Sequence, residues 1–127
     1  MKYLVFIVLL LVIGSSALVH RPISDVALKD MVEANQNGSN LLVVVFTSSN
    51  PEHKTCQALN QKLLELANSH SDAATFVYAD VDEINGNDMK PYIPGYVMLR
   101  GAQLLETIPL ATPQQFEDSL NSYILYN

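Results

Sequence analysis

Residues 41–47 read LLVVVFT, an unbroken run of apolar and β-branched side chains. A strand with one face in water alternates apolar and polar residues, whereas a continuous run is typical of a strand covered on both faces. Such a strand needs a layer of packed elements on each side of its sheet. The run therefore predicts a central strand between two layers, and the elements around it decide the fold class.

Helices are predicted on either side of this strand. Ser24 can cap a helix before it, and a longer helix follows the polar residues 48–51 and runs to about His70. The apolar face expected for the first helix consists of Val26, Ala27, Met31 and Ala34. The face expected for the second consists of Cys56, Leu59, Leu63, Leu66 and Ala67.

The second half of the chain adds three strands and a final helix. Strands are expected at 75–81, 96–99 and 104–108, with a tight turn at Arg100 and Gly101. The run TPQQ at 112–115 is a capping box that begins the last helix. Strands that alternate with helices become parallel, and the closing hairpin adds antiparallel pairing. The expected fold class is α/β, a mixed central sheet with helices on both faces.

The N-terminus is typical of a secretory signal peptide. Lys2 supplies positive charge, residues 3–14 are an apolar run, and Ser15-Ser16-Ala17 offers small residues for cleavage. A membrane anchor would need about 20 apolar residues, and this run has 12. We therefore expect residues 1–17 to be a signal peptide and residues 18–127 a single domain with no membrane span.

Charge and cysteine content narrow the function further. The net charge is −6, and loss of Lys2 with the signal peptide makes it −7, which argues against nucleic acid or anionic membranes as partners. Cys56 is the only cysteine, so no intramolecular disulfide can form. Asn37-Gly38-Ser39 is a glycosylation sequon in a polar loop, which makes Asn37 the expected glycan site.

Several segments, in this order, resemble the thioredoxin fold over nearly all of residues 18–127. LLVVVFT resembles the central strand, and CQALNQKLLELA resembles the helix behind the active site, with Cys56 at the second cysteine of the C-x-x-C motif. VYADVDEI resembles the next strand, and RGAQLLETI the closing hairpin. YIPGYVML resembles the segment with a cis-proline, which implies a cis bond at Pro94. More weakly, VVVFTSSNP is similar to luminal thioredoxin domains of oligosaccharyltransferase subunits.

The chain departs from the family at the residues that carry redox chemistry. His53 stands at the first cysteine of the motif, and Lys54-Thr55 stand between the two cysteine positions. The chain has no tryptophan, and the central strand has no carboxylate. Dithiol exchange needs two thiols, so the ordinary thioredoxin reaction is excluded within one molecule.

Two interpretations of Cys56 are possible from the sequence. Its spacing places it on the apolar face of a helix, where cysteine is a small hydrophobic side chain. Alternatively, His53 could favour its thiolate, and Cys56 could act as a monothiol oxidoreductase with glutathione or a partner thiol. A Cys56-linked dimer stays open as well. His53 and Cys56 are too few for a structural metal site, and no metal or other cofactor is expected.

The resemblance implies a binding surface even without redox chemistry. We expect a polypeptide client or protein partner to lie against residues 50–56 and 93–96. The expected binding residues are His53, Lys54, Thr55, Ile93, Pro94 and Gly95. A structural subunit of a larger secretory complex is a further reading. The expected location is the secretory pathway, either outside the cell or in the endoplasmic reticulum lumen. The acidic residues Asp80, Asp82, Glu83 and Asp88 are interpreted as a solvated connection.

Overall fold

The computed structural model describes residues 18–125, and the signal peptide expected at residues 1–17 lies outside them. Nine elements follow one another along these residues. They are β1 (Val19–His20), α2 (Asp25–Gln36), β2 (Leu41–Thr47), α3 (Lys54–Ser69), β3 (Ala74–Asp80), the 3-10 helix η1 (Asn87–Tyr92), β4 (Gly95–Arg100), β5 (Gln103–Ile108) and α4 (Pro113–Leu125). None of these helices is long and apolar enough to cross a membrane.

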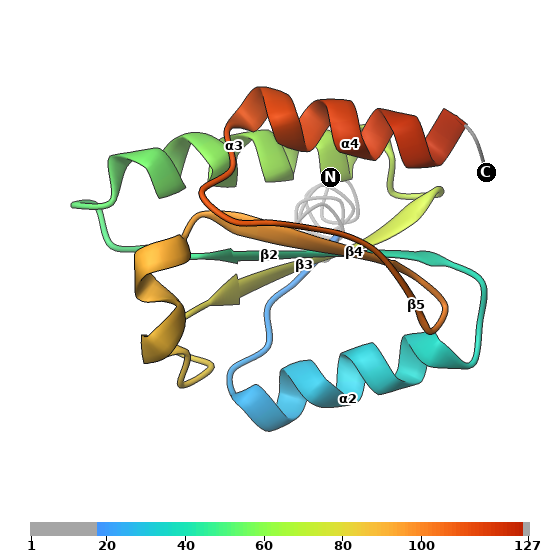
Figure 1. Cartoon of the computed structure of the whole chain (residues 1–127), viewed down its shortest axis with the longest axis horizontal. Coiled ribbons are helices and arrows are strands. Elements are labelled where there is room, and N and C mark those ends of the chain that lie inside the picture. Colours follow the sequence, from blue (N-terminus) through green and yellow to red (C-terminus); the bar gives the residue numbers. More distant parts are fainter. Residues whose placement is uncertain (1–17, 126–127) are drawn as a thin grey trace, which may run out of the picture.

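The five strands form one mixed sheet in the order β1-β3-β2-β4-β5. β1, β3 and β2 run parallel, β4 pairs antiparallel with β2, and β5 closes the sheet as an antiparallel hairpin. Helices α3 and α4 lie on one face, and α2 lies on the other (Figure 1). The predicted α/β class and mixed sheet are confirmed.

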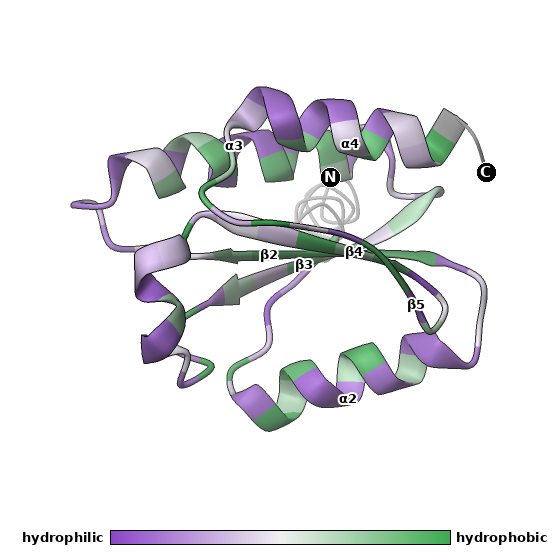
Figure 2. Ribbon diagram, viewed as in Figure 1, coloured by the Kyte–Doolittle hydropathy of each residue, from purple (hydrophilic) through white to green (hydrophobic). Residues whose placement is uncertain are grey.

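The central strand is covered on both faces, as its sequence predicted. Leu41, Val43 and Val45 pack in the cluster under α3 and α4, while Leu42 and Val44 pack in a separate cluster on the α2 side. Figure 2 shows hydrophobic residues along the strands in the middle of the molecule and polar residues on the outer sides of the helices.

The two helices on the α3/α4 face follow the sequence pattern closely. All five residues expected on the apolar face of α3 are buried, and Phe116 and Leu120 of α4 are buried against them. The predicted capping box is present: the Gln115 N–H donates to Thr112 Oγ1 at 3.1 Å, and the Thr112 N–H donates to Gln115 Oε1 at 2.9 Å.

Helix α2 packs on the sheet with a different apolar face from the one predicted from its sequence. Ser24 caps it as predicted, accepting a hydrogen bond from the Ala27 N–H at 3.1 Å. However, Val26 is 64% exposed, and the α2 residues that pack on the sheet are Leu28, Met31 and Val32. The helix carries two overlapping apolar stripes, and the docking of the helix on the sheet selects one of them. Periodicity alone does not predict which of the two stripes faces the sheet.

Candidate functional site

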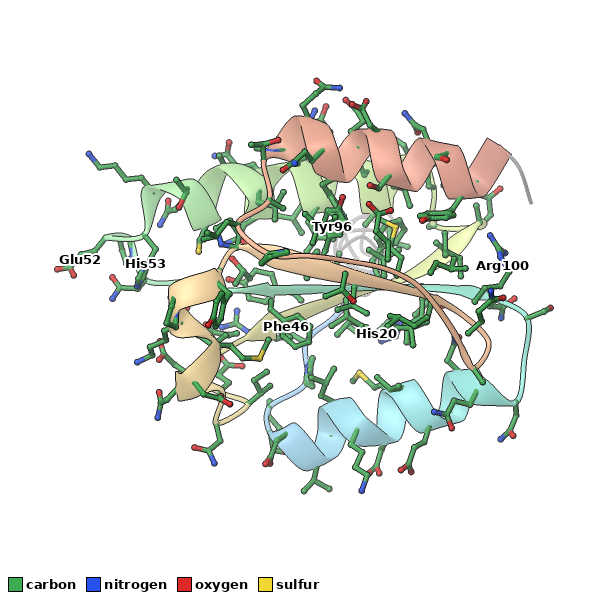
Figure 3. The ribbon with its side chains drawn as sticks, viewed as in Figure 1. His20, Phe46, Glu52, His53, Tyr96 and Arg100 are labelled. Atoms are coloured by element: carbon green, nitrogen blue, oxygen red, sulfur yellow. The ribbon has the colours of Figure 1, made fainter. Side chains whose placement is uncertain are left out.

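The loop after β2 brings the motif residues to the start of α3. The His53 N–H donates to the Asn50 carbonyl at 3.0 Å, which closes the turn before the helix. His53 occupies the N-cap position, yet its side chain makes no capping hydrogen bond. His53, Lys54 and Thr55 are all exposed. In Figure 3, His53 and Glu52 project at the outer tip of this loop, away from Tyr96 in the core.

Cys56 lies in a different environment from His53. The cysteine is 0% exposed and clusters with Val81 and Ile93, with Phe46 and Met89 packed against them. A reactive thiol needs solvent access and electropositive neighbours. The structure therefore surrounds Cys56 with apolar side chains and leaves His53 in water.

The Ile93–Pro94 peptide bond is cis, as the resemblance implied. The residues around it are fastened to the chain after β5: Tyr92 O accepts from the Leu110 N–H at 2.9 Å, and Pro94 O accepts from the Ala111 N–H at 2.7 Å. Within the described residues, no backbone hydrogen bond of normal geometry uses the N–H or the C=O of Ile93. Ile93 thus has one donor and one acceptor unused between two anchored neighbours.

A groove runs past this peptide bond and ends at the start of α4. Its cavity measures about 220 Å³. We call it the cis-proline groove; its lining residues are Thr55, Ala58, Ile93, Pro94, Leu110, Ala111, Thr112 and Pro113. The predicted binding residues Thr55, Ile93 and Pro94 are brought together in it. His53 and Lys54 are not among the residues that line it.

Gly95 has a packing role instead. A Cβ at this position would lie 2.9 Å from the carbonyl oxygen of Ile108 and 3.3 Å from the Cα of Pro109. Any side chain would therefore push β5 away from the beginning of β4. Gly95 keeps the two strands close and lines a second cavity on the opposite side of the sheet from α3 and α4.

Asp80 was missed as a site residue, and its interpretation as part of a solvated connection is wrong. It ends β3 and is only 1% exposed. Its carboxylate accepts hydrogen bonds from Ser49 Oγ at 2.7 Å and from the N–H groups of Ser49 and Asp82 at 3.2 and 2.9 Å. It lies beside Thr47 in the strand pairing. Asp80, the last residue of β3, thus places a buried carboxylate next to Thr47, the last residue of the central strand.

Arg21 completes the surroundings of this carboxylate. Its Nη2 lies 3.4 Å from Asp80 Oδ2, it also pairs with Glu83, and its guanidinium lies 4.9 Å from the centroid of the Tyr78 ring. Burial alone would raise the pKa of Asp80, but the hydrogen bonds from Ser49 and Asp82, together with Arg21, hold that pKa below its usual value. Asp80 is therefore a charged anchor that ties the N-terminal segment to the end of β3.

A neutral network fixes α3 to the strands below it. The Asn60 side chain accepts a hydrogen bond from Thr47 Oγ1 at 2.6 Å and donates to Ser48 O at 3.1 Å. It also donates to Tyr78 Oη at 3.3 Å. These bonds hold the first turns of α3 in position over the carboxyl ends of β2 and β3, which fixes one wall of the cis-proline groove.

Two further expectations concern the surface. Asn37, Gly38 and Ser39 are exposed at the end of α2, so the sequon is open to solvent, and its use stays a prediction. Among residues 18–125, no three histidine, cysteine, aspartate or glutamate side chains converge as metal ligands.

Comparison with known proteins identifies the fold. No protein-family model and no curated protein sequence matches the chain. Solved structures do match. Thioredoxin O1 from Arabidopsis thaliana is 17% identical with a TM-score of 0.68, over 82% of this chain and 96% of that one. Schistosoma mansoni thioredoxin is 20% identical with a TM-score of 0.67, over 83% and 94%.

A third match extends the coverage slightly. Mitochondrial thioredoxin 3 from Saccharomyces cerevisiae is 20% identical with a TM-score of 0.64, over 85% of this chain and 98% of that one. The matched structures are covered almost from end to end, so the likeness includes the whole sheet and its helices. The chain therefore has the thioredoxin fold.

Proposed function

We propose that the chain is a redox-degenerate thioredoxin-like domain of the secretory pathway that binds an extended polypeptide in its cis-proline groove. The observation that carries the proposal is the unused N–H and C=O of Ile93 beside this groove. An extended peptide can bond to such a pair of groups by the same pairing that adds a strand to a sheet. The backbone would supply affinity, and the groove would select side chains.

The lining of the groove favours an apolar side chain of the client. Ala58, Pro94, Ala111 and Pro113 present small apolar groups, and the hydroxyls of Thr55 and Thr112 are its polar side-chain groups. Burial of a client's Leu- or Phe-sized side chain would contribute about 1.5–3 kcal/mol. Clients are therefore expected to be unfolded or extended segments with at least one large apolar residue.

Monothiol exchange is the alternative, and the burial of Cys56 weighs against it. A mixed disulfide would require the thiolate to reach another sulfur, whereas Cys56 is covered by the apolar cluster at the base of α3. Secretory location rests on the signal peptide and the exposed Asn37 sequon. It is tested by expressing the full chain in cultured animal cells and looking for a glycosidase-sensitive mass shift that Asn37→Gln abolishes.

The binding test uses two matched substitutions. Ala58→Arg places a long side chain in the cis-proline groove from an exposed position on α3, and Ala102→Arg makes the same change at an exposed turn between β4 and β5. The probe is a library of short extended peptides rich in leucine and phenylalanine, with binding followed by ¹⁵N chemical shifts of the protein. We expect shifts at Ile93 and Thr55, slower amide exchange at Ile93, and loss of both in Ala58→Arg.

The control variant shows whether the loss of binding is specific to the cis-proline groove. Ala102→Arg should bind like the unaltered protein, and both variants should keep the native melting temperature. Peptide binding that is unaffected by Ala58→Arg, or the absence of any shift at Ile93 at saturating peptide, would overturn the proposal.

A further inference from the structure

A second cavity lies on the α2 side of the sheet, outside the cis-proline groove. It measures about 230 Å³, and its lining is almost wholly apolar. Phe46, Met89, Val97, Thr107 and Pro109 are the lining residues that matter here. We call it the η1 cavity because Met89 and Tyr92 of η1 form one wall. Phe46 also belongs to the cluster that packs against α2, so the cavity lies between η1 and the β4–β5 hairpin on the face of the sheet that α2 covers.

The η1 cavity is open because the elements on this face are short or loosely packed. η1 has six residues and none of them is buried, and no residue of α2 is buried either. The β4–β5 hairpin continues the apolar surface beyond the cavity. Leu104, which pairs with Leu99 of the α2 face, is 59% exposed. Exposed apolar area next to an apolar cavity is typical of a docking surface.

The charges on the flanking elements indicate which partner fits. α2 carries three carboxylates and one lysine, and the crossover of residues 81–94 also carries three carboxylates and one lysine. Both lysines are in ion pairs, Lys29 with Glu33 and Lys90 with Asp82, and Glu83 of the crossover pairs with Arg21. Asp25 and Asp88 are exposed and form no ion pair with another described residue. An apolar surface bordered by net negative charge is complementary to a basic, amphipathic partner.

We propose that the η1 cavity is a second docking site, which takes a large apolar side chain from a basic amphipathic segment of a protein partner. The volume suits one aromatic or leucine side chain, because a cavity of about 150 Å³ already admits benzene. The cationic residues of the segment would lie against Asp88, which adjoins Met89 of the cavity wall. This site is distinct from the cis-proline groove: the two linings share Ile93 alone, and no residue of α3 lines the η1 cavity.

The test distinguishes the two cavities by the residues that they do not share. The probe is a synthetic amphipathic helix of leucine and lysine with one tryptophan on its apolar side, compared with the same helix carrying glutamate for lysine. Thr107→Lys places a cation at the exposed mouth of the η1 cavity, and Asn68→Lys adds the same cation at an exposed position on α3, outside both cavities. The fluorescence of the helix's tryptophan reports affinity, because the protein itself contains no tryptophan.

We expect saturable binding of the lysine helix, ¹⁵N shifts at Met89, Val97 and Thr107, weakening at high salt, and an affinity about tenfold lower in Thr107→Lys. Asn68→Lys should leave this affinity unchanged. Equal binding of the glutamate helix, or shifts confined to the cis-proline groove, would overturn the proposal. It would also be overturned if the free protein formed a dimer in sedimentation that Thr107→Lys dissociated, since a second copy would then cover this face.

Discussion

On the face covered by α3 and α4, side chains from three strands and two helices meet in one large buried cluster. On the face covered by α2 and η1, the buried residues come from the strands and the loop at Ile84, and the helices contribute only partly buried side chains. The first face closes around Tyr96 and Phe116, whose ring centroids are 5.2 Å apart. The second keeps an open cavity next to Phe46.

This difference assigns stability mainly to one face and leaves open apolar surface on the other. Close packing on the α3/α4 face contributes most of the apolar burial, and dense cores tolerate little change. The α2 face and the end of the sheet at Ile93 retain unused backbone groups and open apolar surface. Under the proposed function, partners would bind at these places, while the other face supplies the stability of the domain.

Removing one phenylalanine ring from each face tests most directly whether the two faces contribute unequally to stability. Phe116→Ala removes a fully buried ring and should lower the free energy of unfolding by about 4 kcal/mol. Phe46→Ala removes a partly buried ring that already borders a cavity, so it should cost about 1–2 kcal/mol. Urea unfolding measures both. Equal losses would contradict the division between the two faces.

A smaller effect is expected at the buried carboxylate. Asp80→Asn weakens charge-assisted hydrogen bonds from Ser49 and Asp82 and the pairing with Arg21, and should cost about 2–3 kcal/mol at neutral pH. Asp82→Asn is the matched control. Asp82 is largely exposed, and among residues 18–125 its one ion pair is with Lys90, so this change should cost less than about 0.5 kcal/mol. A comparable loss in both variants would show that Asp80 is not an anchor.

The contribution of Asp80 also predicts how the free energy of unfolding changes with pH. The folded-state pKa of Asp80 lies below its unfolded value, so the stability it contributes is fully present above about pH 4. That stability is lost as the pH falls through the folded-state pKa. Asp80→Asn should therefore flatten the acid limb of the stability curve, measured by urea unfolding from neutral pH downward. An acid limb with unchanged slope would contradict it.

The smallest effect is expected on the outer side of α2. Val26→Ser should change the free energy of unfolding by less than about 0.5 kcal/mol, because Val26 points mostly into water. Leu59→Ser, in the buried cluster under α3, should cost at least about 3 kcal/mol. A large loss in Val26→Ser would restore the apolar face predicted from the sequence.

The sequence predicted the regions where local pattern and tertiary environment agree. The continuous run of β2, the spacing from Cys56 to Ala67 and the capping box at Thr112 each encode their own structure, and all three are confirmed. The cis bond before Pro94 came from the resemblance. The resemblance also pointed to Thr55, Ile93 and Pro94, which line one groove.

What the sequence could not predict depends on partners far along the chain. Asp80 is buried because Ser49, 31 residues away, and Arg21, 59 residues away, reach its carboxylate. An acidic run read locally is indistinguishable from a solvated loop. The η1 cavity likewise depends on how far η1 and α2 extend across the sheet. The run of residues at 84–92 does not specify that distance.

The central claim is that Cys56 belongs to the core and that the domain works by binding. The most direct test is the alkylation rate of Cys56 by iodoacetamide in the folded protein, from about pH 5 to 9, compared with the chain in denaturant. We predict that native-state alkylation follows the population of unfolded chain and rises with denaturant and with Phe116→Ala. Fast alkylation of the folded protein, with a midpoint well below the free-thiol pKa of about 8.5, would contradict the account. It would assign Cys56 to thiol chemistry.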